Sequence, residues 1–154
     1  NLKEEQMTEA MGDIFAGSAS EAQIGAFLGA LSAKGVTFAE LAGAARAMRR
    51  KALKIQVNSP IVLDTVGTGG NAFKAFNIST TTSFVVAACG VTVAKHGNRS
   101  ATSPCGSADL LEKLGVDLHV DPEIVEECID ATGIGFLFAP LYHKAMRAVA
   151  GLRK

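Results

Sequence analysis

Two glycine- and hydroxyl-rich segments, each preceded by an apolar run, lie in the middle of the chain. Residues 64–80 read DTVGTGGNAFKAFNIST, and residues 95–109 read KHGNRSATSPCGSAD. Glycine has no Cβ and tolerates positive φ, so backbone N–H groups in such segments can approach a phosphate closely. The second segment adds the cations Lys95 and Arg99 and neutral hydrogen-bond donors. Together the two segments predict a site that holds several phosphates of one ligand.

Neither segment matches the commoner nucleotide-binding signatures. GTGGN lacks the third glycine of a dinucleotide fingerprint, and no GxxxxGK[ST] occurs. A Rossmann dehydrogenase and a P-loop NTPase are therefore disfavoured. GTGG alone is more often a structural turn than a ligand site. The run KHGNRS followed by CGSADLLEKLG is far more specific, so the interpretation depends on the pair.

The first part of the chain predicts helices. Ser20 with Gln23 and Thr37 with Glu40 are capping-box patterns, and each opens a segment with apolar residues at helical spacing. Pro60 ends the pattern, because proline disfavours helical geometry in the residue before it. We therefore expect an all-helical N-terminal domain over residues 1–59.

Residues 60–154 alternate between strand and helix patterns. The expected strands are 61–66, 91–94 and 134–139, and the expected helices are 80–89, 107–114 with Ser107 as N-cap, and one that opens at Asp121 and Pro122. Repeated βαβ units imply a parallel sheet, with ligands bound beyond the carboxyl ends of the strands. We expect an α/β chain in which the helical domain is followed by the first part of a parallel-sheet domain. Three strands make an incomplete sheet, so the chain looks truncated.

Composition excludes several function classes. Lys and Arg together number 15, as do Asp and Glu, which argues against a surface that coats a polyanion. The basic run at 46–51 suits a helix C-terminus, so nucleic-acid binding is a minority interpretation. Three cysteines without a CxxC spacing indicate reduced thiols and no zinc site. The longest apolar run is too short and too interrupted for a membrane span, so we expect a cytoplasmic protein.

These motifs resemble the anthranilate phosphoribosyltransferases, in the nucleoside phosphorylase-like phosphoribosyltransferase family. The resemblance covers the whole chain through GTGG, FNIST, KHGNRS, GSADLLEKLG and GIGFLFAPLYHKAMR. In that family the chain runs on for about as long again. The resemblance therefore implies an N-terminal portion whose C-terminal half is missing, and which alone is inactive.

The resemblance implies a glycosyltransferase reaction of tryptophan biosynthesis. A phosphoribosyl group passes from phosphoribosyl pyrophosphate to the amine of anthranilate, giving phosphoribosylanthranilate and pyrophosphate. Positive charge develops on the ribose as pyrophosphate leaves, so the enzyme must neutralise the leaving group, normally with Mg²⁺, and hold the amine in line. No catalytic nucleophile or base is required. The resemblance also implies a homodimer through the helical domain, where small residues such as Gly25 and Gly29 would let helices approach closely.

The resemblance also implies the site residues. Ser79 corresponds to a hydroxyl that contacts one Mg²⁺, Lys95 to a pyrophosphate contact, Asn98 to a residue facing anthranilate, and Arg153 to an arginine for the acceptor carboxylate. Asn71 stands where an aspartate is usual, and the acidic pair for a second Mg²⁺ would lie in the absent half. The full set of expected binding residues is Gly67, Gly70, Asn71, Asn77, Ile78, Ser79, Thr80, Lys95, His96, Gly97, Asn98, Arg99, Ser103, Ser107 and Arg153.

Several of these residues also have structural interpretations. Ser79 and Thr80 could cap the following helix, and His96 could be a packed histidine. Asp109 and Glu112 are interpreted as helix-dipole partners rather than catalysts. Two other functions stay open: a pyrimidine nucleoside phosphorylase, which carries a different lysine-serine-glycine loop, and a non-catalytic nucleic-acid-binding protein on the same fold. Steeply salt-dependent DNA binding would identify the last.

Overall fold

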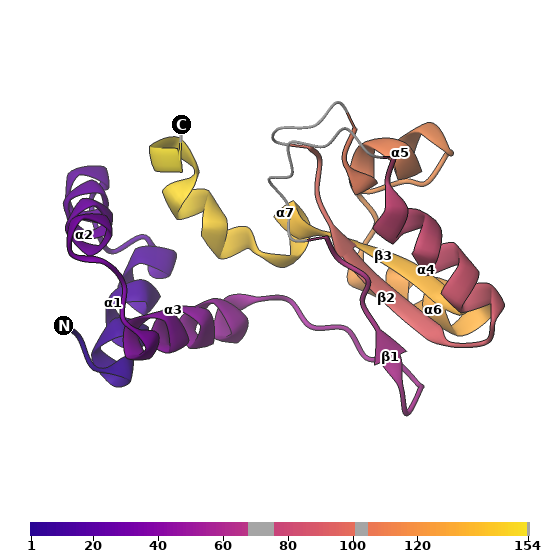
Figure 1. Ribbon diagram of the computed structural model, residues 1–154, viewed down its shortest axis with the longest axis horizontal. Coiled ribbons are helices and arrows are strands. Elements are labelled where there is room, and N and C mark those ends of the chain that lie inside the picture. The colour runs from indigo at the N-terminus through magenta and orange to yellow at the C-terminus, as the bar shows by residue number, and fades with distance from the viewer. Residues whose placement is uncertain (68–75, 101–104, 154) are drawn as a thin grey trace. The chain divides into compact units, whose positions relative to one another are not determined.

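The computed structural model describes residues 1–67, 76–100 and 105–153, and it divides the chain into two compact units. One unit contains Asn1–Leu53 with His143–Lys154, and the other contains Lys54–Tyr142. The first is helical and the second holds a parallel sheet (Figure 1), so the expected fold class is confirmed. The expected domain boundary after residue 59 stays a prediction.

The helical unit is built from three α-helices and a late 3₁₀ segment. These are α1 (Glu4–Ala16), α2 (Glu21–Lys34), α3 (Phe38–Lys51) and η1 (Lys144–Arg153). Both predicted capping boxes are present: the Ser20 hydroxyl accepts from the Gln23 N–H at 3.3 Å, and the Thr37 hydroxyl accepts from the Glu40 N–H at 3.3 Å. Each satisfies a backbone donor that the first helical turn leaves unpaired.

The core of the helical unit forms where α1 and α3 approach closely. Met7, Met11 and Ile14 of α1 are buried together with Ile24, Ala47 and Val149. Gly43 of α3 permits this approach, because a Cβ there would lie 2.8 Å from the Met7 Cβ and would also strike the Glu4 carbonyl oxygen. The Thr8 hydroxyl donates to the Gly43 carbonyl at 3.2 Å across the same contact.

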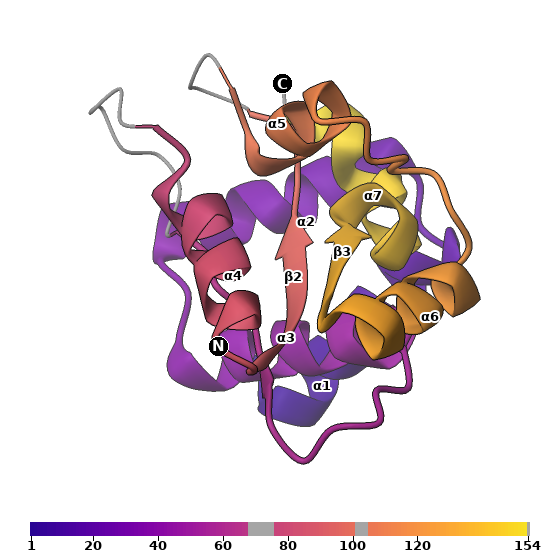
Figure 2. The ribbon, with the colours of Figure 1, turned by 90° about the vertical axis from the view of Figure 1, so that its right-hand side faces the viewer.

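The described residues of the α/β unit form three strands and four helices. Its elements are β1 (Val62–Leu63), α4 (Ile78–Ala88), β2 (Thr92–Gly97), α5 (Ser107–Lys113), α6 (Pro122–Thr132), β3 (Ile134–Phe138) and α7 (Ala139–Tyr142). The strand order is β1-β2-β3 and both pairings are parallel. Figure 2 shows β2 and β3 pointing the same way, with α4 and α6 on either side of them.

The register assigns side chains to the two faces of the sheet. Lys95 pairs with Phe136, so both face the same side, and Thr80 and Ser83 of α4 line a cavity with them. On the opposite face, a Cβ at Gly135 would lie 2.5 Å from a side-chain carbon of Ile129, so α6 packs there. The glycine thus lets α6 lie directly on β3.

Two predicted helix starts are wrong. The N-cap of α5 is Gly106 and not Ser107, whose hydroxyl instead donates to the Asn98 carbonyl at 3.3 Å. The helix α4 begins at Ile78 with Asn77 as N-cap, so Ser79 and Thr80 lie inside its first turn and do not cap it. In both helices a contact with the neighbouring loop fixes the start. Within the described ranges, no helix is both long and apolar enough to cross a membrane.

Candidate functional site

The two glycine-rich segments begin beside each other, at the carboxyl ends of neighbouring parallel strands. Asp64 follows β1, and Asn98 follows β2. Gly67 is described and exposed, and a Cβ there would meet nothing within 4 Å. The expected contacts Gly70, Asn71 and Ser103 lie outside the described residues. The described part of the site comprises residues 62–67, 76–80, 95–100 and 105–112.

The two ends of the second segment are held against each other. The Asn98 carbonyl accepts from the Ala108 N–H at 3.2 Å and from the Ser107 hydroxyl. Gly106 lies so close to the opposite end that a Cβ would be 2.7 Å from the Asn98 carbonyl oxygen. Gly97 has a similar role, because a Cβ there would lie 2.8 Å from the Phe136 ring and would strike the Ser107 hydroxyl. Both glycines are needed for this close backbone approach.

Asn77 joins the first segment to the second. Its side-chain Nδ2 donates to the Gly106 carbonyl at 3.2 Å and contacts the Cys105 Sγ at 3.6 Å. Because Asn77 is also the N-cap of α4, this contact fixes the start of α4 against the second segment. Ile78, the next expected residue, is exposed.

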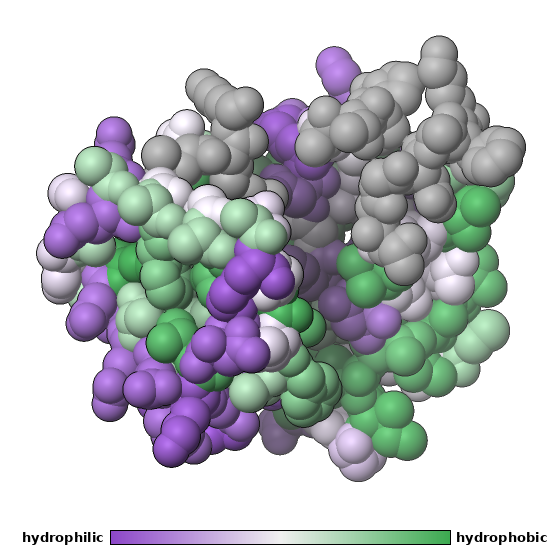
Figure 3. All heavy atoms as spheres, turned by 60° about the vertical axis from the view of Figure 1, so that its left-hand side comes forward, coloured by the Kyte–Doolittle hydropathy of each residue, from purple (hydrophilic) through white to green (hydrophobic). Residues whose placement is uncertain are grey.

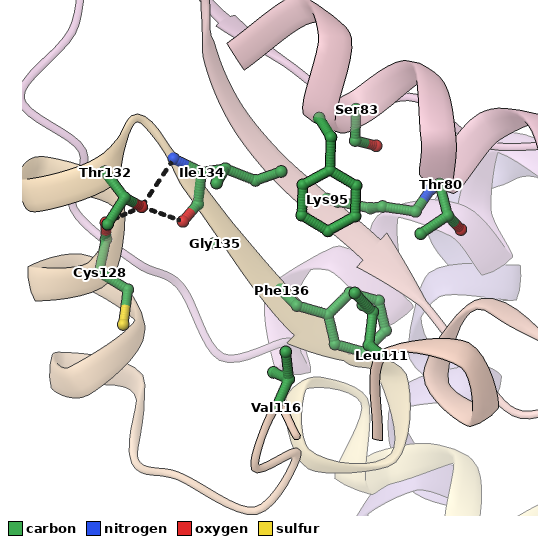
Figure 4. Close-up of a pocket in the computed structure, with 11 residues that line it drawn as sticks. Thr80, Ser83, Lys95, Leu111, Val116, Cys128, Thr132, Ile134, Gly135 and Phe136 are labelled. Atoms are coloured by element: carbon green, nitrogen blue, oxygen red, sulfur yellow. Dashed lines mark hydrogen bonds between the residues drawn. The ribbon is translucent and has the colours of Figure 1, made fainter. Parts of the chain in front are cut away.

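Lys95 is buried at the base of the first segment. Its side chain projects from β2 toward α4 (Figure 4), is 3% exposed, and donates from Nζ to the Thr65 carbonyl. Burial lowers the pKa of the Lys95 ammonium, and the nearby Asp64 carboxylate opposes that shift. Asp64 also accepts from the His96 N–H at 3.1 Å. The two strands are thus linked by side chains at the point where both segments start.

Hydroxyl groups connect the start of the first segment, at Thr65, to α4. The Thr65 Oγ1 lies 2.6 Å from the Ser83 Oγ and donates to the Ser79 carbonyl at 2.9 Å. Ser79 is half-buried. Thr80 is 1% exposed, and its hydroxyl has no hydrogen-bond partner among the described residues. Unpaired buried hydroxyls are uncommon in folded proteins, which makes Thr80 a candidate ligand contact.

Arg99 is held by two carboxylates. Its guanidinium donates to Asp109 at 3.0 Å and to both carboxylate oxygens of Glu112, at 2.8 and 2.7 Å. These bonds raise the pKa of Arg99 and lower the pKa of Glu112. The pKa of Asp109 is lowered mainly by the backbone N–H groups of Gly106 and Ser100. The expectation that Arg99 supplies charge to a phosphate stays a prediction, because in this structure its donors point to Asp109 and Glu112.

A cavity of about 180 Å³ adjoins Lys95 and Thr80. Its walls come from α4, β2, β3, α5 and α6, and Figure 4 shows Phe136 of β3 and Leu111 of α5 close to the Lys95 side chain. Most of the lining is apolar. Of the expected site residues that the structure describes, Thr80 and Lys95 line this cavity, whereas Asn77 and Ser107 do not.

The structure brings some expected residues together and leaves others unconnected. Asn77, Asn98 and Ser107 meet around Gly106, whereas Lys95 lies with Thr65. Arg153 belongs to the helical unit, and its side chain lies outside what the structure describes. Within the described ranges, no group of three or more His, Cys, Asp or Glu residues could hold a metal ion.

Sequence reasoning missed Asp64, Thr65 and the contacts of Asp109. A signal existed for the first two, since they directly follow an apolar strand and precede a glycine. Asp109 is the third residue of α5 and so occupies a position where an acid commonly caps its own helix. Its additional contact with Ser100 depends on the path of the loop and gives no local sequence signal.

Two family models match successive parts of the chain, and they differ from the structural units in placing residues 143–154 with the α/β part. Residues 59–154 match the glycosyl transferase family, a/b domain, and residues 1–52 match the glycosyl transferase family, helical bundle domain. A protein of Syntrophobacter fumaroxidans named anthranilate phosphoribosyltransferase is 64% identical over 154 residues, which is all of this chain and 46% of that protein. The chain therefore spans about half the length of the curated relatives it matches.

Solved structures give the same result. The crystal structure of anthranilate phosphoribosyltransferase from Thermus thermophilus matches with a TM-score of 0.90 and 50% identity, over 99% of this chain and 46% of that one. The Saccharomyces cerevisiae anthranilate phosphoribosyltransferase in complex with PRPP and Mg matches with a TM-score of 0.85 and 28% identity, over the same shares.

Proposed function

Because the chain belongs to the glycosyl transferase family, we propose that it is the N-terminal portion of an anthranilate phosphoribosyltransferase. The full-length protein would transfer the phosphoribosyl group of phosphoribosyl pyrophosphate to the amine of anthranilate, a step of tryptophan biosynthesis. The printed names of the relatives support this activity. The structural observation that carries it is the Asn77–Gly106 contact, which joins two glycine-rich segments at the carboxyl ends of adjacent parallel strands.

The proposed chemistry requires positioning and charge neutralisation. As the bond from C1′ to pyrophosphate breaks, negative charge builds on the pyrophosphate and positive charge on the ribose. Backbone N–H groups near Gly67 and the second N–H of the Asn77 amide would bind the leaving group, and Ser107 would join them if its hydroxyl turns away from the Asn98 carbonyl. Lys95, which donates to the Thr65 carbonyl of the first segment, would add positive charge. Because Lys95 is buried, the electrostatic effect of that charge is strengthened.

Magnesium is proposed as the cofactor, bound together with the pyrophosphate. When present it would stabilise the negative charge of the leaving group. Mg²⁺ is usually bound by one or two carboxylates and by substrate phosphates. Among the described residues Ser79 offers one hydroxyl, and no cluster of three acidic, His or Cys side chains is present. The described residues alone therefore do not form a complete metal site, and the remaining ligands would come from substrate and from the rest of the protein.

The acceptor is proposed to lie on the side of Asn98 and His96. His96 lies near the carboxyl end of β2 and Asn98 directly follows that strand, so both would lie beside the proposed pyrophosphate contacts. Arg153 is proposed for the anthranilate carboxylate, because a guanidinium binds a planar carboxylate with two parallel bonds. The full-length protein is further proposed to form a homodimer through its helical unit.

The two alternatives have less support. A pyrimidine nucleoside phosphorylase does not fit the names of the relatives, which are anthranilate phosphoribosyltransferases at 64% and 59% identity. Nucleic-acid binding would use the basic residues of α3. One of these cations, Arg46, already forms an ion pair with Glu4.

A fluorescence assay tests the proposed function. Anthranilate is fluorescent and loses that fluorescence on conversion to its phosphoribosyl product. The full-length protein, with phosphoribosyl pyrophosphate and Mg²⁺, is expected to consume anthranilate and release one pyrophosphate for each molecule consumed. Phosphorolysis of uridine or thymidine without any consumption of anthranilate would instead support the phosphorylase.

A further inference from the structure

A single carboxylate, that of Asp109, connects both ends of the second segment. Its Oδ2 accepts from the Gly106 N–H at 2.8 Å and from the Ser100 N–H at 3.1 Å. Its Oδ1 accepts from Arg99 at 3.0 Å. In the chain, Ser100 directly precedes residues 101–104, and Gly106 follows them after Cys105. Asp109 therefore holds the incoming and outgoing backbone at a fixed separation.

Arg99 extends this connection to two further elements. Its bidentate pair with Glu112 reaches one turn along α5, and its guanidinium carbon lies 5.8 Å from the centre of the Phe138 ring at the end of β3. Bidentate pairs between arginine and carboxylate restrict geometry more than single hydrogen bonds do. The Arg99 and Glu112 side chains are exposed, so their charges are partly screened by water, and the contribution of this pair is mainly geometric.

The backbone held by Asp109 carries the groups proposed to bind substrate. The Gly106 carbonyl accepts from Asn77, and the Asn98 carbonyl accepts from Ser107. A shift of Gly106 would therefore move the contact that joins the two segments. Such a shift is opposed by close packing, because Gly106 already lies against the backbone of Asn98 and Arg99.

We propose that Asp109 is a positioning residue of the phosphoribosyl pyrophosphate site, acting through Ser100, Gly106 and Arg99. This inference rests on the function proposed above. Asp109 would not bind the substrate itself, because an ionised carboxylate has no hydrogen to donate to a pyrophosphate and its oxygens already accept from two backbone N–H groups and one guanidinium. The bond to Arg99 also offsets the negative charge that Asp109 would otherwise place near a pyrophosphate.

Three substitutions in the full-length protein separate the contacts of Asp109. Asp109→Ala removes both backbone bonds and the bond to Arg99. Asp109→Asn keeps the shape but leaves one acceptor oxygen, so it cannot serve the backbone and Arg99 together. Glu112→Gln weakens only the support of Arg99. Glu127→Gln on α6, an exposed acid away from the site, is the matched control.

The expected result is a graded loss of affinity for phosphoribosyl pyrophosphate. Asp109→Ala should raise the KM for phosphoribosyl pyrophosphate at least tenfold and more than the KM for anthranilate. Asp109→Asn should raise the KM for phosphoribosyl pyrophosphate less than Asp109→Ala does, and Glu112→Gln should raise it least of the three. Calorimetric binding of pyrophosphate with Mg²⁺ should weaken in the same order, while Glu127→Gln should match the wild type.

Each outcome decides the proposal. An unchanged KM for phosphoribosyl pyrophosphate in Asp109→Ala overturns it, as does an equal rise of both KM values, which indicates a general structural role. If Asp109→Ala does not fold, Asp109→Asn decides: a selective rise in the KM for phosphoribosyl pyrophosphate supports the proposal, and wild-type kinetics overturn it. A wild-type protein that consumes no anthranilate would refute the proposed function instead, and the pyrophosphate calorimetry would still test the role of Asp109.

Discussion

Two cations of the same segment, Lys95 and Arg99, occupy different environments. Lys95 is buried on β2 and donates to the Thr65 carbonyl, whereas Arg99 lies beyond the strand and is paired with two acids. The alternation of side chains along a strand explains why Lys95 points into the unit. The sequence predicted both as phosphate contacts, because composition shows the charge of a side chain but not its partners.

Removal of the Lys95 charge should weaken binding of phosphoribosyl pyrophosphate selectively. Lys95→Met keeps the apolar stem that lines the cavity and removes the ammonium. A hydrogen bond to a charged group is worth about 1.5–3 kcal/mol, so the KM for phosphoribosyl pyrophosphate should rise roughly tenfold to a hundredfold. Steady-state kinetics of the full-length enzyme measure it, with exposed Lys113→Met as control. If the kinetics equal those of the control, the Lys95 ammonium does not contribute to binding of phosphoribosyl pyrophosphate.

The helical elements were predictable from sequence where the signal was local. The pairs Ser20–Gln23 and Thr37–Glu40 form the expected capping boxes, and α6 begins at Pro122 as expected. The starts of α4 and α5 were not predictable, because Asn77 and Ser107 bond to residues 29 and 9 positions away in the chain. A local sequence pattern predicts where a helix starts when the capping partner lies within one helical turn. The prediction fails when the partner lies in another loop.

The Glu40 carboxylate near the start of α3 should make the free energy of unfolding decrease as the pH becomes acidic. Glu40 is 0% exposed and accepts from Lys34, from the Leu2 N–H and from Thr37, and these bonds lower its pKa to about 2. A carboxyl whose folded pKa is depressed stabilises the fold above its unfolded pKa, and that contribution is lost as pH falls from about 4.5 toward about 2. Stability should therefore decline through this window.

Thermal unfolding of the full-length protein between pH 5 and pH 3 measures this decline. Glu40→Gln should lower the Tm at pH 5 and flatten its dependence on pH, because the amide cannot titrate. Glu9→Gln, an exposed acid on α1, should keep the wild-type slope. Parallel slopes for wild type and Glu40→Gln would show that this network does not set the acid sensitivity.

At the scale of the whole molecule, each unit exposes large apolar side chains. In the helical unit Phe38 is 88% exposed and Leu41 is 63% exposed, and in the α/β unit the exposed set includes Phe76, Phe84 and Val85. Green hydrophobic side chains are visible at the surface in Figure 3. Large apolar side chains that gather at a surface commonly mark contact with another chain or domain.

The helical unit is expected to form the proposed homodimer. Light scattering of the full-length protein at micromolar concentration should give twice the mass of one chain. Phe38→Ser combined with Leu41→Ser should shift the mass toward the monomer, because apolar burial drives such interfaces. Ile124→Ser, at an exposed apolar residue of α6 in the other unit, is the control. A monomeric wild-type protein would refute the dimer.

The 154-residue chain alone is expected to show no measurable transfer, and the remaining part of the protein should restore it. The chain spans 46% of a relative with 64% identity, and its described residues contain no cluster of three acidic, His or Cys side chains to hold Mg²⁺. Loss of metal stabilisation costs several kcal/mol, and about 1.4 kcal/mol is tenfold in rate, so the deficit should exceed roughly a thousandfold.

The anthranilate fluorescence assay measures that deficit when the mass-verified chain is compared with the same chain co-expressed with the rest of the protein. The full-length variant Lys95→Met serves as a reference for a site that is complete but weakened, since it should regain rate at high phosphoribosyl pyrophosphate concentration. The chain alone should not regain rate under those conditions, because saturation with substrate cannot supply missing metal ligands. Turnover by the isolated chain near that of the full-length enzyme would mean that residues 1–154 already hold every group the reaction needs.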